Sequence, residues 1–150
     1  MGFFVEFVPF DAGVYMGAFV SLNVEYMTWI MGQLEENYGV DSFSVLGQTV
    51  PEWVDENLEP FISLRPSEWV LFILEVEGEA AGMGAVKRLR EGVGEVKRVF
   101  VHPRFRGRGY GRRMLDEVLA AGRELGCSSF LLDTPRWAEA AQHIYRSLGS

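Results

Sequence analysis

Cysteine and histidine are both scarce in this sequence, and their scarcity limits the chemistry that the chain can carry. The chain contains one cysteine, Cys127, and two histidines, His102 and His143. A single cysteine cannot form a disulfide within the chain, and so few thiol and imidazole groups do not supply a transition-metal site. We therefore expect a function that requires no metal.

Basic residues are almost missing from the first part of the chain. Residues 1–86 contain fourteen acidic residues and one basic residue, Arg65, whereas residues 87–150 contain thirteen basic and seven acidic residues. The formal net charge of the whole chain is −7, and a protein of this charge is a poor candidate for binding nucleic acid. If an anionic ligand binds, the basic second part is where we expect it.

Signals for secretion or membrane insertion are also lacking. No basic segment precedes the first apolar residues, and polar side chains such as Asn23 and Gln33 interrupt the weakly charged stretch 12–34. These features predict a cytoplasmic protein that contacts no membrane. The length of 150 residues suits one domain, and we expect a single domain over residues 1–150.

The strongest pattern lies between Arg98 and Arg113. Residues 99–101 are β-branched or aromatic and predict a strand, which ends at Pro103 because proline cannot donate a hydrogen bond to a sheet. Glycines then alternate at positions 107, 109 and 111, and an apolar helical period follows over residues 114–125. A strand, a glycine-rich turn and a helix start together present backbone N–H groups to phosphate. Positive charge is added there by Arg104, Arg106, Arg108, Arg112 and Arg113.

Periodicity and turn residues predict the elements around this stretch. Asp11 is the expected cap of a long first helix, which Gly17 could interrupt and which Gly39 would end. Pro51 is expected in the first turn of a second helix. The expected order is strand 4–8, helix 12–38, loop 41–50, helix 51–62, strands 70–76, 80–87 and 95–101, the glycine loop and its helix, strand 129–132, and helix 137–148.

The stretch from Arg98 to Arg113 resembles the acetyl-CoA-binding signature of the GNAT acetyltransferase superfamily. The family pattern, Arg/Gln-x-x-Gly-x-Gly/Ala, is filled by Arg106, Gly109 and Gly111. The surrounding frame is matched at Val99, Val101, Pro103, Arg106, Gly107 and Gly109. The resemblance implies an α/β (α+β) GNAT fold, in which helices flank a central, mixed, mostly antiparallel sheet. Relatives usually continue with two further strands, so we expect these C-terminal strands to be missing.

The resemblance also implies a function. An amine would attack the thioester of acetyl-CoA directly, without a metal, while backbone N–H groups near residues 99–101 stabilise the developing oxyanion. The residues expected to bind this co-substrate are Val99, Phe100, Val101, Arg106, Gly107, Arg108, Gly109, Tyr110, Gly111 and Arg112. The alternative is a catalytically silent GNAT-like module that binds acyl-CoA as a sensor or partner domain. Turnover of CoA distinguishes the enzyme from the silent module, and a different acyl group remains a third interpretation.

Two residues are the candidates for proton transfer. Glu95 matches an acid that related sequences keep on this strand and is the expected general base, directly or through water. The alternative for Glu95 is a solvated glutamate paired with Lys97 or Arg98. Tyr145 matches the family's tyrosine next to the CoA sulfur and is the expected general acid, unless it is a core aromatic residue. His102 is interpreted as a loop histidine.

The acceptor and the oligomeric state are predicted from charge and from the expected open edge. In this family the acidic first part would supply the helices that flank the acceptor cleft. We therefore expect a cationic primary amine, on a small molecule or a peptide, that acidic side chains attract. The alternative is that these acids only make the surface soluble. Missing C-terminal strands would leave a sheet edge open to pairing, which predicts a homodimer.

Overall fold

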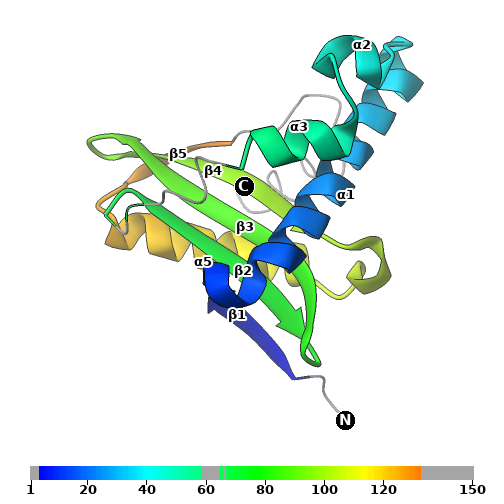
Figure 1. The fold of residues 1–150 in the computed structure, drawn as a ribbon. Coiled ribbons are helices and arrows are strands. Elements are labelled where there is room, and N and C mark those ends of the chain that lie inside the picture. The colour runs from blue at the N-terminus through cyan, green and yellow to red at the C-terminus, as the bar shows by residue number, and fades with distance from the viewer. Residues whose placement is uncertain (1–3, 59–64, 66, 133–150) are drawn as a thin grey trace.

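The computed structural model describes residues 4–58, 65 and 67–132, which form one five-stranded sheet with helices on both faces (Figure 1). The strands lie in chain order and are β1 (Val5–Pro9), β2 (Trp69–Val76), β3 (Glu79–Arg90), β4 (Val93–Val101) and β5 (Ser129–Leu132). Neighbouring strands are antiparallel from β1 to β4, and β5 pairs parallel to β4. This arrangement confirms the expected mixed, mostly antiparallel sheet.

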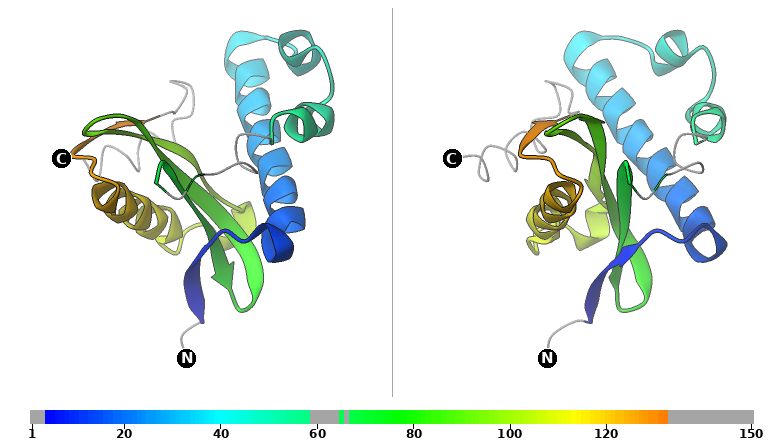
Figure 2. Two further views of the ribbon diagram at one scale, coloured as in Figure 1. Left: turned by 60° about the vertical axis from the view of Figure 1, so that its left-hand side comes forward. Right: turned by 90° about the vertical axis from the view of Figure 1, so that its left-hand side faces the viewer.

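Three helices lie on one side of the sheet, and one long helix covers the other side (Figure 2). The first group is α1 (Ala12–Tyr38), α2 (Ser42–Leu46) and α3 (Val50–Glu56), and the opposite helix is α5 (Tyr110–Glu124). α1 has the predicted caps, because the Asp11 side chain accepts a hydrogen bond from the Gly13 N–H and Gly39 is left-handed. α1 passes through Gly17 without interruption. In the described ranges, no helix has the length and apolar character needed to cross a membrane.

Two of the predicted segments differ from the structure. The expected loop 41–50 contains α2, which is capped by Asp41 and ended by the left-handed Gly47. A helix of five residues is too short to show a helical period in sequence, so the prediction missed it. α3 begins with a Thr49–Glu52 capping box and ends at Glu56, short of the predicted limit. Residues 59–64 and the predicted helix 137–148 lie outside the described residues.

The sheet is buried on both faces by two separate groups of apolar side chains. On the α1 face, Phe19, Leu22 and Ile30 pack with Leu71, Ile73, Met83 and Phe100. On the α5 face, Met114, Leu115 and Val118 pack with Leu74, Val86, Val96 and Val101. Successive strand residues point to opposite faces, so the apolar runs in β2 and β3 supply both groups. The sheet is therefore a fixed platform between α1 and α5.

A bulge near the end of β4 changes which face its last residues occupy. Ala85 pairs with Lys97 and Met83 pairs with Phe100, so the single residue Gly84 lies opposite both Arg98 and Val99. Arg98 has a φ of 59°, in the left-handed region that non-glycine residues rarely adopt. The additional residue turns Phe100 to the α1 face, although Val96, four residues earlier, packs on the α5 face. Strained backbone of this kind is often found at functional sites.

Close contact between β3 and β4 beside this bulge gives a prediction about stability. A Cβ atom on Gly82 would lie 2.6 Å from the backbone oxygen of Phe100, which cannot move without disturbing the strand pair. Gly82→Ala should therefore lower the free energy of unfolding by about 1–3 kcal/mol, as overpacking generally does. The matched control is Gly32→Ala on α1, where a Cβ would have no neighbour within 4 Å.

Gly32→Ala should instead raise the free energy of unfolding, because alanine stabilises a helix interior by up to about 1 kcal/mol relative to glycine. Urea unfolding of the two variants and the parent measures both effects. Equal stability of the two variants would contradict the close approach of β3 and β4.

Candidate functional site

The connection between β4 and α5 places the start of a helix beside the end of a strand. His102 begins a short 3-10 helix, η1 (Pro103–Phe105), and the chain then turns through Gly107 and Gly109, whose φ angles are 83° and 78°. Gly109 is the N-cap of α5 and makes no side-chain cap hydrogen bond. Apart from the chain neighbours of each glycine, no atom of the described residues lies within 4 Å of the position that a Cβ would occupy on Gly107 or Gly109. The loop therefore has open space in front of the first N–H groups of a helix, which suits an anion.

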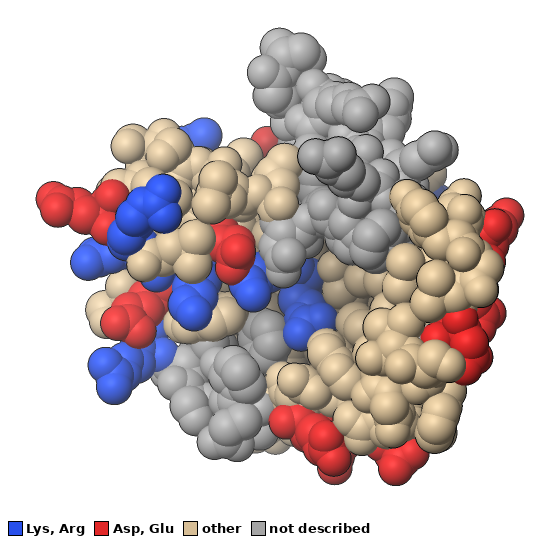
Figure 3. Space-filling model, turned by 90° about the horizontal axis from the view of Figure 1, so that it is seen from above, with Lys and Arg blue, Asp and Glu red and all other residues tan. Residues whose placement is uncertain are grey.

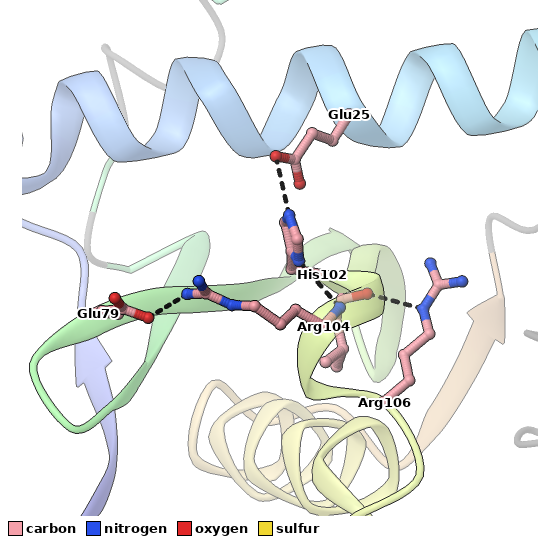
Figure 4. A network of polar contacts seen from close by, with 6 residues as sticks. Glu25, Glu79, His102, Arg104 and Arg106 are labelled. Atoms are coloured by element: carbon pink, nitrogen blue, oxygen red, sulfur yellow. Dashed lines mark hydrogen bonds and ion pairs between the residues drawn. The ribbon is translucent and has the colours of Figure 1, made fainter.

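The arginines predicted around the loop have different surroundings. Arg104 forms an ion pair with Glu79 at the β3 end (Figure 4). Arg106 turns back toward the sheet, where its Nε donates a hydrogen bond of 2.9 Å to the Val101 carbonyl. Its guanidinium carbon lies 5.6 Å from the ring centroid of Trp29 and 5.4 Å from that of Phe100. Arg106 thus fastens the loop to β4 and to α1.

Partial burial lowers the pKa of the Arg106 guanidinium. The group nevertheless keeps its positive charge near neutral pH, because a guanidinium does not deprotonate in the physiological pH range. Arg106 is therefore a permanent cation on this side of the loop. Tyr110, also predicted at the loop, has its side chain buried in the α5 face at 6% exposure, so only its backbone faces the loop.

The last residues of β4 have a partner strand on one side only. β5 pairs with β4 from Val93 to Val96 and, within the described part of the chain, no further. Beyond that point β4 continues as the bulge and the residues up to Val101, with their backbone groups on the β5 side facing no described strand. The Val101 carbonyl at this end of β4 accepts the hydrogen bond from Arg106, which belongs to the glycine loop. The predicted co-substrate residues Val99, Phe100 and Val101 therefore lie beside the glycine loop.

A pocket of about 360 Å³ lies between α1 and the end of β4. Its lining residues are Val24, Glu25, Thr28, Trp29, Phe100, His102, Pro103 and Arg106. Glu25 Oε1 lies 3.4 Å from His102 Nε2, and His102 Nδ1 accepts a hydrogen bond of 3.0 Å from the Arg104 N–H (Figure 4). This pair joins residues 25 and 102, and no local sequence pattern indicated it. His102 lies in the loop between β4 and η1, as the sequence indicated, and its side chain also lines the pocket.

Of the two predicted catalytic residues, the structure describes Glu95 but not Tyr145. Glu95 lies on β4 one residue before Val96, on the face opposite to α5, and its Oε1 is 3.2 Å from Lys97 Nζ. Its side chain is 23% exposed, so it is accessible but ion-paired. Tyr145 lies outside the described residues. The described chain holds no group of three metal-ligating side chains.

Acidic and basic side chains are unevenly distributed over the surface around the sheet. Viewed from above, the coloured side chains along the rim of the helical side are acidic, whereas Lys and Arg occur toward the middle and on the opposite side, where further acidic side chains lie among them (Figure 3). Glu35, Glu36, Asp55 and Glu56 are exposed members of the helical group. Arg98 lies under the helices, with its guanidinium carbon 5.7 Å from the Tyr26 ring and 6.0 Å from the Trp53 ring. Of the acidic residues on α1, Glu25 is the one that lines the pocket.

Comparison with known proteins relates this geometry to a family. Residues 29–149 match the model of the acetyltransferase (GNAT) family. The chain is 40% identical over 73 residues to the IAA acetyltransferase of Azospirillum brasilense, an alignment that covers 48% of each protein. It is 33% identical over 52 residues to the thialysine N-epsilon-acetyltransferase of Sus scrofa, covering 35% of this chain and 31% of that protein. The alignments thus span about half of the bacterial relative and a third of the pig relative.

A solved structure supports the same arrangement of elements. The structure of an aminoglycoside N-acetyltransferase in complex with CoA matches with a TM-score of 0.68 at 17% identity. The match covers 99% of this chain and 89% of that one. At this identity the similarity establishes the fold.

Proposed function

The chain belongs to the acetyltransferase (GNAT) family, and on that premise we propose that it transfers an acetyl group from acetyl-CoA to a primary amine. The observation that supports this proposal most strongly is the open glycine loop at the start of α5, beside the end of β4 that β5 does not pair with among the described residues. A Cβ at Gly107 or Gly109 would occupy the space in front of the loop, which fits a ligand that contacts the backbone. The pyrophosphate of CoA would be held there by the N–H groups of residues 106–112.

The proposed reaction requires three contributions from the protein. The acceptor ammonium must lose a proton, after which its nitrogen bonds to the acetyl carbon as the carbon–sulfur bond breaks and CoA leaves as the thiol. N–H groups at the end of β4 would stabilise the negative charge that develops on the thioester oxygen. We assign Glu95 as the general base, acting through water because its carboxylate is paired with Lys97. We assign Tyr145 as the acid that protonates the thiolate.

A screen of primary amines with acetyl-CoA tests the proposed function. Free thiol is measured over time, and the acetylated product is identified by mass spectrometry. We expect time-dependent thiol release that requires both the protein and an amine. Calorimetric binding of acetyl-CoA without thiol release from any amine would instead support a silent acyl-CoA-binding module. A panel of longer acyl-CoA substrates tests the choice of acyl group.

The acceptor is proposed to be a cationic amine, because acidic residues dominate the helical side of the cleft. The names of the two relatives point to different acceptors, IAA and thialysine, so they leave the choice open. If acidic side chains attract the substrate, kcat/KM should fall as ionic strength rises, since the screening length is only about 8 Å at physiological salt.

The measurement is kcat/KM across a salt series for a cationic amine and for an amine that is uncharged at the assay pH. We expect kcat/KM to fall with rising ionic strength for the cationic amine and to stay constant for the uncharged one. Equal, flat responses for both amines would mean that the acids serve solubility only.

The cytoplasmic location and the homodimer remain predictions. Light scattering, which measures the mass of the particle in solution, tests the homodimer.

A further inference from the structure

We propose that Glu25 is the residue that holds the ammonium group of the acceptor, in the pocket between α1 and the end of β4. His102 acts as a positioning residue that orients the Glu25 carboxylate. This inference rests on the proposed acetyl transfer and adds to it the site and the chemical class of the acceptor.

The first observation concerns the two oxygens of Glu25. Oε1 faces His102 Nε2 at 3.4 Å. Oε2 is buried and has no hydrogen-bond partner among the residues that the structure describes. Buried polar atoms are nearly always satisfied, and an ionised carboxylate without a donor is unfavourable. The Glu25 side chain as a whole is 40% exposed and lines the pocket, so rotation of its carboxylate would bring the oxygen that lacks a donor to the pocket surface, and a primary ammonium carries three donors.

The second observation concerns the imidazole of His102. Nδ1 accepts a hydrogen bond of 3.0 Å from the Arg104 N–H, so the proton of the neutral ring is assigned to Nε2. Nε2 lies 3.4 Å from Glu25 Oε1, so the protonated side of the ring faces the carboxylate. Arg104 in turn belongs to the loop that follows β4, and it is paired with Glu79. The orientation of the carboxylate on α1 is thus set by the loop that is proposed to hold CoA (Figure 4).

The pocket walls indicate what kind of amine fits. Apart from Glu25 and His102, the surfaces are supplied mainly by apolar and aromatic side chains, among them Val24, Trp29 and Phe100. Arg106 also lines the pocket, where it donates a hydrogen bond to the Val101 carbonyl and lies over the ring of Trp29. A volume of about 360 Å³ is in the range of small-ligand sites. The site therefore fits a primary ammonium carried on a mainly apolar chain, such as an alkylamine or a lysine-like side chain.

Glu95 lies on β4, whereas Glu25 lies on α1 and faces a different part of β4. Glu95 lies five residues before Phe100, which corresponds to roughly 15 Å at the usual rise of about 3.3 Å per residue. Glu25 faces the Phe100–His102 end, where the edge of β4 meets the glycine loop. The two carboxylates therefore do not contact the same nitrogen. Glu25 binds the amine, and Glu95, if it is the base, removes the proton through a chain of waters rather than through a single one.

The test compares Glu25→Gln with Glu36→Gln, a matched change at an exposed position of the same helix. Glu25→Gln removes the charge and keeps the shape. We expect kcat/KM for cationic alkylamines to fall about 10- to 100-fold, because a charge-assisted hydrogen bond to the ammonium is lost. The KM for acetyl-CoA and its calorimetric affinity should stay at the parental values. Glu36→Gln should keep the parental affinity for acetyl-CoA and change kcat/KM for cationic amines far less than Glu25→Gln does.

A neutral acceptor separates amine binding from general damage. An arylamine that is uncharged at the assay pH should react equally with the parent and with Glu25→Gln. His102→Gln should also lower kcat/KM for cationic amines, but by a smaller factor, because the Glu25 carboxylate stays in place and only loses the contact that orients it. Parental kcat/KM of Glu25→Gln with cationic amines overturns the proposal, and so does an equal loss with neutral and cationic amines. If the parent transfers acetyl to no amine at all, the proposed function fails first, and that result needs no variant.

Discussion

Gly109→Val is expected to abolish acetyl-CoA binding while the sheet and helices remain folded. Gly109 is the N-cap of α5 and has a φ of 78°, a conformation that a β-branched residue strongly disfavours. The valine side chain would also fill the open space in front of the helix N-terminus. Loss of two or more hydrogen bonds to phosphate weakens binding by at least about a hundredfold. Isothermal titration calorimetry with acetyl-CoA measures the effect.

The control for this experiment is Gly126→Val at the other end of α5. Gly126 has a φ of 93°, and a Cβ there would have no neighbour within 4 Å. Both variants therefore introduce a similar backbone strain, of about 1–2 kcal/mol or more. Only the change at Gly109 lies on the glycine loop. Equal acetyl-CoA affinity of the two valine variants would contradict the assignment of the loop.

Tyr145→Phe should lower kcat by about 10²–10⁴, the usual contribution of a general acid, while acetyl-CoA affinity changes little. The substitution deletes the hydroxyl and keeps the ring, so a purely structural tyrosine would tolerate it. Steady-state kinetics with the best acceptor from the amine screen gives kcat, and calorimetry gives the affinity. The control is Tyr38→Phe at the exposed end of α1, which should leave both values unchanged.

Glu95→Gln provides the comparison for the base. If Glu95 removes the proton through water, kcat falls while the KM for the amine stays near the parental value, the reverse of the effect expected for Glu25→Gln. A kcat of Tyr145→Phe equal to that of the parent would return Tyr145 to a packing role. The same result for Glu95→Gln would leave Glu95 as the ion-pair partner of Lys97.

Local signals allowed much of the fold to be predicted from sequence. Asp11 and Gly39 cap α1 as expected, and Gly78 and Gly92 adopt positive φ angles in the turns that join the predicted strands. The glycine loop was predictable for the same reason, because Gly107 and Gly109 signal a backbone that other residues avoid. These features depend on residues within a few positions of one another, which is the range over which sequence patterns are informative.

Features that depend on packing between distant segments could not be predicted in this way. The bulge at Arg98 and Val99 is set by the pairing of β4 with β3, and neither residue type indicates a left-handed conformation. The pair of Glu25 and His102 joins α1 to the loop after β4 across most of the chain. Net charge likewise indicated acidic helices but not that Glu25 alone of the α1 acids lines the pocket.

Transfer of a labelled acetyl group tests the central claim most directly. The protein is incubated with acetyl-CoA deuterated in the acetyl group and with a cationic primary alkylamine, and the products are analysed by mass spectrometry. The account predicts that the deuterated acetyl group appears on the nitrogen of the amine in proportion to free CoA. Recovery of the label only as intact acetyl-CoA or as free acetate, with every amine tried, would contradict it.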